Sequence, residues 1–375
     1  NAVEQNKRIV IVGDFDADGA TSTSVCILAL RAMGYRNVDY LVPNRFDFGY
    51  GLSVPIVNEA AKQGAEVIVT VDNGISCIDG VTHAKALGMQ VVVTDHHLPG
   101  EVLPPADAIV NPNQPGCTFP SKNLAGVGVA FYIMLALKAE LQQRGYFEKV
   151  GIAPPNLASL LDIVAVGTVA DVVVLDKNNR ILVHQGLQRI RAGKCRPGIK
   201  ALVEVANRDC AHLTSTDLGF VVGPRLNAAG RLDDMSQGIA CLLEEETIQA
   251  RMIAAELDAL NKERREIETG MKAQAEAVLE QMALDEGDMP SALVVYREDF
   301  HQGVIGIVAG RLKEKYLKPV IAFAHQDDVI IKGSARSIPG VHIRDVLEEV
   351  NTRYPGVIDK FGGHAMAAGL SLPLE

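Results

Sequence analysis

Short apolar runs alternate with helical stretches in the first hundred residues of the chain. The runs at 7–13, 66–72 and 90–94 are rich in Val and Ile and lack alternating polar positions, which is typical of strands buried on both faces of a parallel sheet. A further strand is expected at VDYLVP (38–43), and helices are expected at 21–33, 54–63 and 77–87. This βαβα order predicts an α/β domain with a doubly wound parallel sheet and right-handed crossovers.

The apolar pattern changes to helical spacing after residue 126. Helices are expected at 127–144 and 156–166, and the apolar segment GTVADVVVL that follows them contains one carboxylate, Asp171. A charged group inside so apolar a segment needs a specific reason. Residues 248–284 contain no proline and carry apolar positions at helical spacing, which predicts one long helix.

A second, smaller α/β unit is expected after the long helix. Its strands are ALVVY, PVIAFA and VIIKGSARS, its helices lie at 304–316 and 342–354, and the Gly-rich segment FGGHAMAAG closes it. We therefore expect a catalytic, metal-binding domain at 1–235, a long connecting helix at 236–286 and a substrate-binding domain at 287–375.

Length and composition indicate a soluble globular protein with more than one domain. At 375 residues the chain exceeds the size at which a single core keeps growing. No apolar run is long enough to span a bilayer, so no membrane association is expected. The six cysteines form no C-x-x-C pair, which argues against a zinc cluster and favours a reducing, cytoplasmic location. Because the chain begins at Asn1 rather than Met, we expect a fragment of a longer protein.

The charge of the chain is distributed unevenly. The net charge is −10, yet residues 177–231 hold 10 Lys and Arg against 3 Asp and Glu. A basic stretch within an acidic chain is an electrostatic signature of a phosphate-bearing partner, and a solvated surface is the alternative interpretation.

Acidic and imidazole side chains follow three of the expected strands. Because the carboxyl ends of parallel strands meet at one edge of the sheet, these side chains should converge. So many carboxylates in one place would repel one another and raise each other's pKa values unless cations were bound. The residues are Asp14, Asp16, Asp18, Asp72, Asp95, His96 and His97.

The segment GDFDADG resembles the first half of an EF-hand calcium loop. The match fails at loop position twelve, where Val25 replaces the bidentate Glu, and a strand rather than a helix precedes the segment. A strand followed by carboxylates on a Gly turn, ahead of a helix, is suited to holding metal and phosphate together. A purely structural turn is the alternative, although a turn rarely needs three Asp in five residues.

The VDNG motif is a weaker indication of a metal site than the adjacent pair His96 and His97. Asp72 in VDNG is compatible with a simple Asx turn, and its position after the third strand is what favours a ligand that bridges two cations. His96 and His97 are adjacent after a buried strand, so they cannot both face the core. One can bind metal while the other contacts the substrate. Imidazole beside carboxylates favours manganese-like ions over an all-oxygen magnesium site.

Two neighbouring cations make phosphoester hydrolysis the expected reaction, because they activate water and stabilise charge on a phosphoryl group. Covalent and hydride chemistry are disfavoured. No G-x-S-x-G motif is present, and GVGVAF at Gly126 lacks the last glycine of a dinucleotide fingerprint.

The motifs GDFDADG, VDNG, TDHH and GTVADVV, in this order, resemble the four motifs of the DHH phosphoesterase superfamily. The segments NRFDFGYGL, GPRLNAAGRLDD, HQGVIGIVAGR, KGSARS and FGGHAMAAG are similar to those of its bacterial single-strand-specific 5′→3′ DNA exonucleases. The resemblance covers essentially the whole chain. It implies a DHH domain, a connecting helix and a smaller DHHA1 domain, and two bound divalent cations, Mn²⁺ or Mg²⁺.

The resemblance also implies roles for individual residues. Asp72 is the expected bridge between the cations, Asp95 orients its neighbours, and His97 contacts phosphate or acts as a general acid. The implied metal ligands are Asp14, Asp16, Asp18, Asp72, His96 and Asp171. The implied substrate-binding residues are Arg225, Asn227, Arg231, His301, Ser334, Arg336, Gly362, Gly363 and His364. For each Arg a surface ion pair is the alternative, and Phe46 and Tyr50 either stack on bases or pack their own loop.

The function implied by the resemblance is two-metal exonucleolytic hydrolysis of single-stranded DNA in repair and recombination. The implied partners are single-stranded DNA and, among proteins, a single-strand-binding protein and a helicase. A hydrolase of short oligonucleotides or cyclic dinucleotides is the first alternative, and an inactive DHH scaffold is the second. We also expect the chain to lack the OB-type domain of its parent and hence to bind DNA in a more salt-sensitive way.

Overall fold

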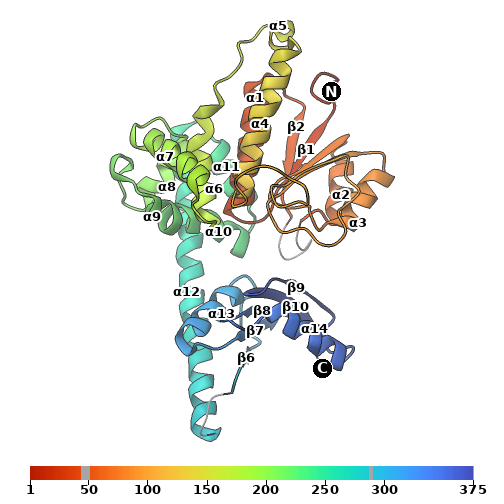
Figure 1. Ribbon diagram of the computed structural model, residues 1–375. Coiled ribbons are helices and arrows are strands. Elements are labelled where there is room, and N and C mark those ends of the chain that lie inside the picture. Colours follow the sequence, from red (N-terminus) through yellow and green to blue (C-terminus); the bar gives the residue numbers. More distant parts are fainter. Residues whose placement is uncertain (44–50, 287–289, 375) are drawn as a thin grey trace. The chain divides into compact units, whose positions relative to one another are not determined.

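The computed structural model describes residues 1–43, 51–286 and 290–374, without the side chains of 278 and 281–286 (Figure 1). Phe46 and Tyr50 lie outside the described residues. The chain divides into two compact units, Asn1–Asn261 and Lys262–Glu375. Within the described residues, no helix has both the length and the apolarity needed to cross a bilayer.

The first unit is built on a parallel sheet of five strands in the order β2-β1-β3-β4-β5. Alternate residues of each strand face opposite sides, so Ile9 and Ile11 enter one core while Val10 and Val12 enter another. The strands are β1 Ile9–Val12, β2 Val38–Leu41, β3 Val67–Thr70, β4 Gln90–Thr94 and β5 Ala108–Val110. Helices cover both faces, which confirms the doubly wound α/β architecture.

The two helical layers of this sheet differ in size. One face is covered by two short helices, α2 Val54–Lys62 and α3 Ile78–Ala86. The other face carries α1 Ala17–Ala32 and α4 Gly126–Gln143, against which the remaining helices pack in a larger core. These are α5 Tyr146–Val150, η1 Leu157–Leu160, α6 Leu161–Ala170, α7 Lys177–Arg191, α8 Pro197–Val205, η2 Cys210–His212, α9 Ser215–Asp217, η3 Leu218–Val222 (a π-helix), α10 Gly223–Leu232 and α11 Ser236–Leu243.

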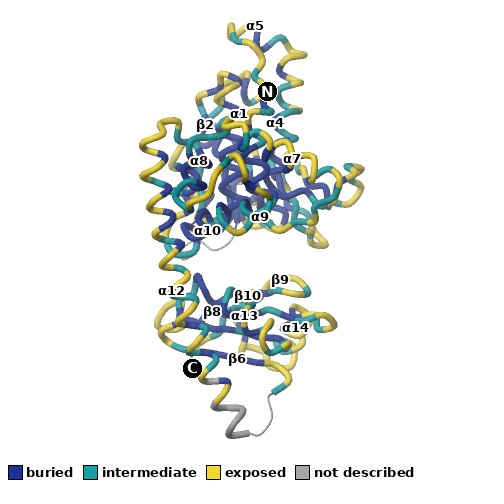
Figure 2. The backbone as a smooth tube through the Cα atoms, turned by 90° about the vertical axis from the view of Figure 1, so that its left-hand side faces the viewer, coloured by how far each residue is buried: buried dark blue, intermediate teal, exposed yellow. Residues whose placement is uncertain are grey.

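The long helix expected from the sequence is α12, Thr247–Glu286, with 40 residues. Its first turns bury Ala250, Ala254 and Leu257 in the core of the first unit. Between Asn261 and Met271 no residue of the helix is buried, as Figure 2 shows by colour. The boundary between the compact units falls in this stretch, and the domain limits at 235/236 and 286/287 remain predictions.

The second unit contains a mixed sheet of five strands in the order β6-β7-β8-β10-β9. Only β6 and β7 pair in parallel, and the other pairs are antiparallel. The Gly-rich segment, for which the sequence pattern predicted no element, forms β9 and the start of β10. The elements are β6 Leu293–Tyr296, α13 Ile305–Tyr316, β7 Val320–His325, β8 Ile330–Arg336, α14 Ile343–Arg353, β9 Lys360–Gly363 and β10 Ala367–Pro373.

Candidate metal centre and substrate-binding residues

The carboxyl ends of β1, β3 and β4 bring acidic and imidazole side chains to one edge of the parallel sheet. Asp14 follows β1, and Asp16 is the N-cap of α1, where its side chain accepts a hydrogen bond from the Gly19 N–H. Asp72 follows β3, and Asp95, His96 and His97 follow β4. From the helical layer, α6 adds Asp171 as its C-cap.

Three sets of these side chains have ligand atoms that, within a set, all lie within 4.8 Å of one another. One set comprises Asp72, Asp95, His96 and His97, and the other two are named here. The first of these two, called the aspartate group, consists of Asp14, Asp16 and Asp72. The second, here called the histidine group, consists of Asp18, His96 and Asp171. Asp72 belongs to the aspartate group and also adjoins the histidine group, because its Oδ1 lies 3.0 Å from His96 Nε2.

The atoms at the centre of this cluster are buried without hydrogen-bond partners. This is the case for Asp72 Oδ1, His96 Nε2 and Asp171 Oδ2. His96 Nε2 lies 3.5 Å from Asp171 Oδ2 and 3.8 Å from Asp18 Oδ2. Burying polar atoms without partners is costly, so several such atoms aimed at one point fit a bound cation. The oxygen and imidazole donor set suits Mn²⁺ and also admits Mg²⁺.

The electrostatics of the cluster lead to the same interpretation. Burial raises the pKa of Asp18 to about 7, and the neighbouring Asp16 adds to the effect. Burial and then the charge of Asp18 raise the pKa of Asp171 to about 9, and the pKa of Asp72 is raised for the same reasons. Carboxyls with raised pKa values become good ligands when a cation replaces the proton.

His96 behaves as a neutral imidazole. Burial, followed by the charge of His97, lowers its pKa to about 4. Its short contacts to carboxylates are therefore not ion pairs at neutral pH, although they fall within ion-pair distance. A neutral imidazole with a free ring nitrogen is the form that ligates metals.

His97 is held in place by Asp95. The carboxylate of Asp95, only 1% exposed, accepts hydrogen bonds from His97 Nδ1 at 2.7 Å and from the backbone N–H groups of Ile75, His96 and His97. Burial alone would lower the pKa of His97, but the hydrogen bond and charge of Asp95 outweigh it and raise this pKa. Asp95 is thus engaged with its neighbours, as the sequence interpretation expected.

Backbone strain marks two positions of the cluster. Asp72 has a φ of 60° and Val172, next to Asp171, has a φ of 63°. The left-handed region is tolerated by Asp but is a clear outlier for a β-branched residue. Strain of this kind persists where surrounding structure enforces it, often at functional sites.

The N-terminus of α4 is a part of the site that the sequence analysis missed. Asp18 accepts hydrogen bonds from the N–H groups of Gly126 at 2.6 Å and Val127 at 2.8 Å. A Cβ atom on Gly126 would lie 2.6 Å from Asp72 Cβ, so only glycine allows this approach. The helix terminus thus stabilises the charge of Asp18 and packs directly on Asp72.

Sequence and structure comparisons agree with the two-unit architecture. The sequence model of the DHH family N-terminal domain matches residues 8–168, and that of the DHHA1 domain matches residues 290–375. A solved structure described as exonuclease RecJ bound to manganese is 33% identical, with a TM-score of 0.80, and the match covers 99% of this chain and 87% of that chain. The chain belongs to the RecJ family.

Curated RecJ relatives are more similar still. The single-stranded-DNA-specific exonuclease RecJ of Dickeya dadantii is 63% identical over 99% of this chain, and that of Escherichia coli is 61% identical over 99%. In both cases the chain spans 64% of the relative's length. The DHH match ends before Asp171, which the geometry nevertheless brings into the histidine group.

The predicted substrate-binding residues of the first unit lie on α10 in different environments. Arg225 is buried, and its Nε and Nη2 contact Asp258 Oδ1 at 2.9 and 2.8 Å. Asn227 Oδ1 accepts a hydrogen bond from the Ala17 N–H at 2.8 Å. Arg231 is half-buried. The ion pair weighed as the alternative for Arg225 is therefore present, though buried rather than exposed, and a phosphate contact by Arg225 remains a prediction.

Three of the predicted residues of the second unit, Ser334, Arg336 and Gly362, share one face of its sheet. Ser334 pairs with Gly369, which pairs with Gly362, so all three lie in one row across β8, β10 and β9. Arg336 lies two residues further along β8, on the same face, and its Nη1 donates to Ser334 Oγ at 3.0 Å.

Arg336 combines burial with the absence of an acidic partner. Burial lowers its pKa, and within the described residues no carboxylate forms an ion pair with it. A Cβ atom on Gly306, in the first turn of α13, would lie 2.9 Å from its guanidinium. A guanidinium beside a helix N-terminus is an arrangement suited to phosphate.

The remaining predicted residues of this unit are Gly363, His364 and His301. Gly363 ends β9 with a φ of 148°, and the His364 N–H donates to the Ala367 carbonyl at the hairpin. His301 precedes α13, and its Nδ1 accepts a hydrogen bond from the Gly303 N–H. Their roles toward substrate remain predictions.

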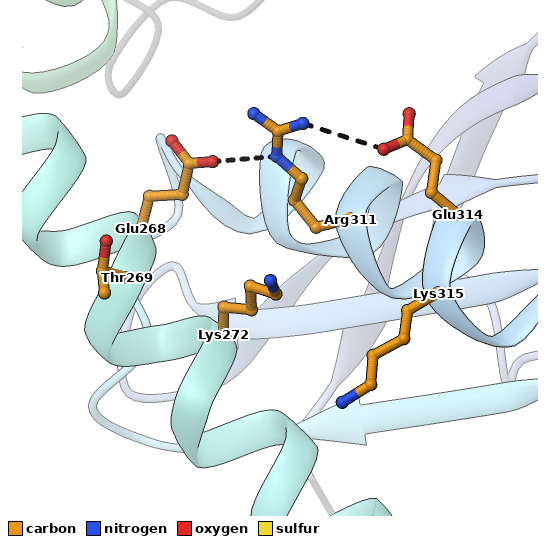
Figure 3. A pocket seen from close by; sticks show the side chains of 6 residues that line it. All are labelled: Glu268, Thr269, Lys272, Arg311, Glu314 and Lys315. Carbon is orange, nitrogen blue, oxygen red and sulfur yellow. Dashed lines mark hydrogen bonds and ion pairs between the residues drawn. The ribbon is translucent and has the colours of Figure 1, made fainter.

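A surface pocket of about 580 Å³ also belongs to the second unit (Figure 3). It lies between α12 and α13, and its lining residues are Glu268, Thr269, Lys272, Arg311, Glu314 and Lys315. Arg311 pairs with Glu268 and Glu314, and Lys272 and Lys315 both pair with Glu276. Because the charged side chains of this pocket form ion pairs, it does not resemble the cluster of unpartnered ligand atoms in the first unit.

Proposed function

We propose that this chain is the catalytic core of a two-metal exonuclease that hydrolyses the phosphodiester bonds of single-stranded DNA from the 5′ end, in DNA repair and recombination. The observation that carries the proposal is the cluster of buried, unpartnered ligand atoms at the edge of the parallel sheet. The RecJ relatives support the substrate and the reaction.

The aspartate group would hold one divalent cation and the histidine group the other, with Asp72 adjoining both. Mn²⁺ is favoured by the imidazole ligand, and Mg²⁺ is the alternative. When bound, such a pair of cations activates water and stabilises charge on the phosphoryl group. Asp18 would be shared between its cation and the N–H groups at the start of α4, which fix its orientation.

His97 and Asp95 would supply the proton for the leaving oxygen. The hydrogen bond between Nδ1 of His97 and Asp95 fixes the orientation and the tautomer of the imidazole. Because Asp95 raises the pKa of His97, the imidazole is more readily protonated near neutral pH than an unassisted one. This pairing supports a role as general acid.

The distribution of charge favours a polymer over a small anion as substrate. The helix α7 and the segment after it, residues 177–203, contain seven Lys and Arg residues and no Asp or Glu. Several of these are exposed, including Lys177, Arg180 and Lys194. A short oligonucleotide or a cyclic dinucleotide would not need so long a basic stretch of sequence. The protein partners expected from the family, a single-strand-binding protein and a helicase, and a cytoplasmic location remain parts of the proposal.

End-labelled DNA tests the function directly. Single-stranded and double-stranded DNA, labelled at either end, would be incubated with the protein and Mn²⁺, beside Asp72→Ala and the matched surface variant Asp79→Ala. We expect labelled mononucleotide at once from 5′-labelled single strands and progressive shortening of 3′-labelled ones, abolished only by Asp72→Ala.

Three outcomes would contradict the proposal. Activity confined to dinucleotides would favour the small-substrate hydrolase. Absence of any hydrolysis and of Mn²⁺ binding would favour the inactive scaffold. Equal degradation of double-stranded DNA would remove the single-strand specificity.

A further inference from the structure

The loop that carries Asp14, Asp16 and Asp18 packs against α10. A Cβ atom on Gly230 would lie 1.9 Å from the Phe15 carbonyl oxygen, so the helix backbone touches the loop backbone. A Cβ atom on Gly223, at the other end of α10, would lie 3.1 Å from Ala170 Cβ, next to Asp171. The helix therefore packs against both segments that deliver the metal ligands.

A polar contact joins α10 to the loop. The Ala17 N–H, which lies between the carboxylates of Asp16 and Asp18 in the chain, donates to Asn227 Oδ1 at 2.8 Å. Ala17 is only 1% exposed, so water is a poor substitute for this acceptor. Asn227 is part of the GPRLNAAGR motif, for which the sequence suggested substrate binding.

The neighbouring backbone N–H groups of the loop donate to carboxylates, which is what the Ala17 N–H could do without Asn227. The Phe15 N–H donates to Asp14 Oδ1 at 2.8 Å, and the Gly19 N–H donates to Asp16 Oδ1 at 2.9 Å. Each of these carboxylates thus already gives one oxygen to the loop backbone. Without the amide oxygen of Asn227, the Ala17 N–H would be left unsatisfied or would compete for another carboxylate oxygen.

The position of α10 is itself fixed by a buried ion pair. Arg225 is held by Asp258 of α12, and its Nη1 also donates to the Val221 carbonyl at 2.7 Å. Both partners are mostly buried, with side chains 10% and 7% exposed. The ion pair thus fixes the part of α10 that carries Asn227, two residues after Arg225, next to the loop.

We propose that Asn227 is a positioning residue for the metal loop, which keeps carboxylate oxygens available for cations by satisfying the Ala17 N–H. It acts on cation binding rather than on DNA. The inference rests on the proposed two-metal function and assigns Asn227 a role different from the substrate contact that the motif suggested.

Two isosteric variants separate the acceptor from the shape of the side chain. Asn227→Leu removes the acceptor oxygen, whereas Asn227→Asp retains it. Asn156→Ala is the matched control, because Asn156 Oδ1 makes the same kind of bond to the Ala158 N–H at the exposed start of η1. Mn²⁺ affinity is measured by calorimetry without DNA, and KM for single-stranded DNA is measured at saturating Mn²⁺.

We expect Asn227→Leu to weaken Mn²⁺ binding about 10–100-fold, as for other residues that orient metal ligands, with KM for DNA unchanged. Asn227→Asp should bind Mn²⁺ within about threefold of the parent chain, as should the control, since both keep the loop acceptor. If Asn227→Leu does not fold, Asn227→Ala serves the same comparison.

The inference is overturned if the leucine variant binds Mn²⁺ like the control, or if both isosteric variants lose affinity equally. A raised KM for DNA with unchanged Mn²⁺ affinity would instead make Asn227 a substrate contact. If the parent chain itself bound no Mn²⁺, the proposed function would fail first, and the calorimetry would reveal this before any variant is compared.

Discussion

Replacing Gly126 with alanine should damage the metal site although the substitution removes no charged group. The added Cβ would lie 2.6 Å from Asp72 Cβ and 2.7 Å from Asp72 Oδ1. Ordinary carbon–carbon contact requires about 3.5–4.0 Å, so either Asp72 or the start of α4 must move by roughly 1 Å. The second movement would also break the hydrogen bonds from Gly126 and Val127 to Asp18.

The expected magnitudes follow from this displacement. Overpacking of this kind costs about 1–3 kcal/mol of folding stability. A misplacement of about 1 Å in a catalytic group lowers the rate about a hundredfold. We therefore expect Gly126→Ala to fold, to bind Mn²⁺ more weakly and to hydrolyse single-stranded DNA about a hundred times more slowly than the parent chain.

The matched control is Gly128→Ala, in the same helix. The three atoms nearest to its Cβ would all belong to Leu124, and the closest, Cδ2 at 3.0 Å, is the end of a side chain that can rotate. Alanine in a helix interior also gains up to about 1 kcal/mol over glycine. Urea unfolding, Mn²⁺ calorimetry and single-turnover hydrolysis compare the two variants. If Gly126→Ala hydrolyses DNA as fast as Gly128→Ala, the close approach of α4 to Asp72 is not needed for function.

Three further predictions follow from the same geometry. The folded-state pKa values of Asp18, about 7, and Asp171, about 9, lie above the ordinary 3.8, so the metal-free folded state binds more protons than the unfolded state. The contribution of these two carboxyls to folding stability is complete below pH 3.8 and is lost as the pH rises through 7 and 9. The thermal unfolding midpoint measured in EDTA should therefore fall over this pH range. A midpoint that rose instead would contradict the burial of the carboxyls. Asp171 must take up a proton to be buried at pH 8, because its folded-state pKa is about 9, and Asp171→Asn removes both this cost and a ligand. The variant should therefore melt higher than the parent in EDTA at pH 8 and gain less from Mn²⁺, whereas a parent-like Mn²⁺ gain would exclude Asp171 as a ligand. Asp258→Ala leaves Arg225 buried without its partner and should cost about 3–5 kcal/mol in urea unfolding; a loss below about 1 kcal/mol would show that the pair is not buried in solution.

The architecture of the first unit followed from local pattern. Runs such as those ending at Val12 and Thr94 are short, apolar and β-branched, and their alternation with helices leaves few topologies. The rule that ligands collect at the carboxyl ends of parallel strands then predicts, from the sequence alone, that Asp14, Asp72 and His96 lie close together.

The parts that sequence did not predict depend on contacts between distant segments. Gly126 meets Asp18 across 108 positions, and nothing in GVGVAF indicates which carboxylate its N–H will face. Arg225 in its motif has the chemistry of a phosphate ligand, and only its burial against Asp258 reveals an internal partner. In the second unit, the glycines at 362, 363 and 369 interrupt the apolar pattern by which strands are predicted, so β9 and the start of β10 were not expected. Strand pairing there depends on backbone hydrogen bonds.

We propose that side chains following β1, β3 and β4, together with side chains of α1 and α6, hold a pair of divalent cations. Anomalous X-ray diffraction from crystals of this chain soaked in Mn²⁺ tests it most directly. We expect two manganese peaks, one ligated by the aspartate group and one by the histidine group, with Asp72 in contact with both. Crystals saturated with Mn²⁺ that show no peak at these residues, or show the two groups turned toward separate sites, would contradict the account.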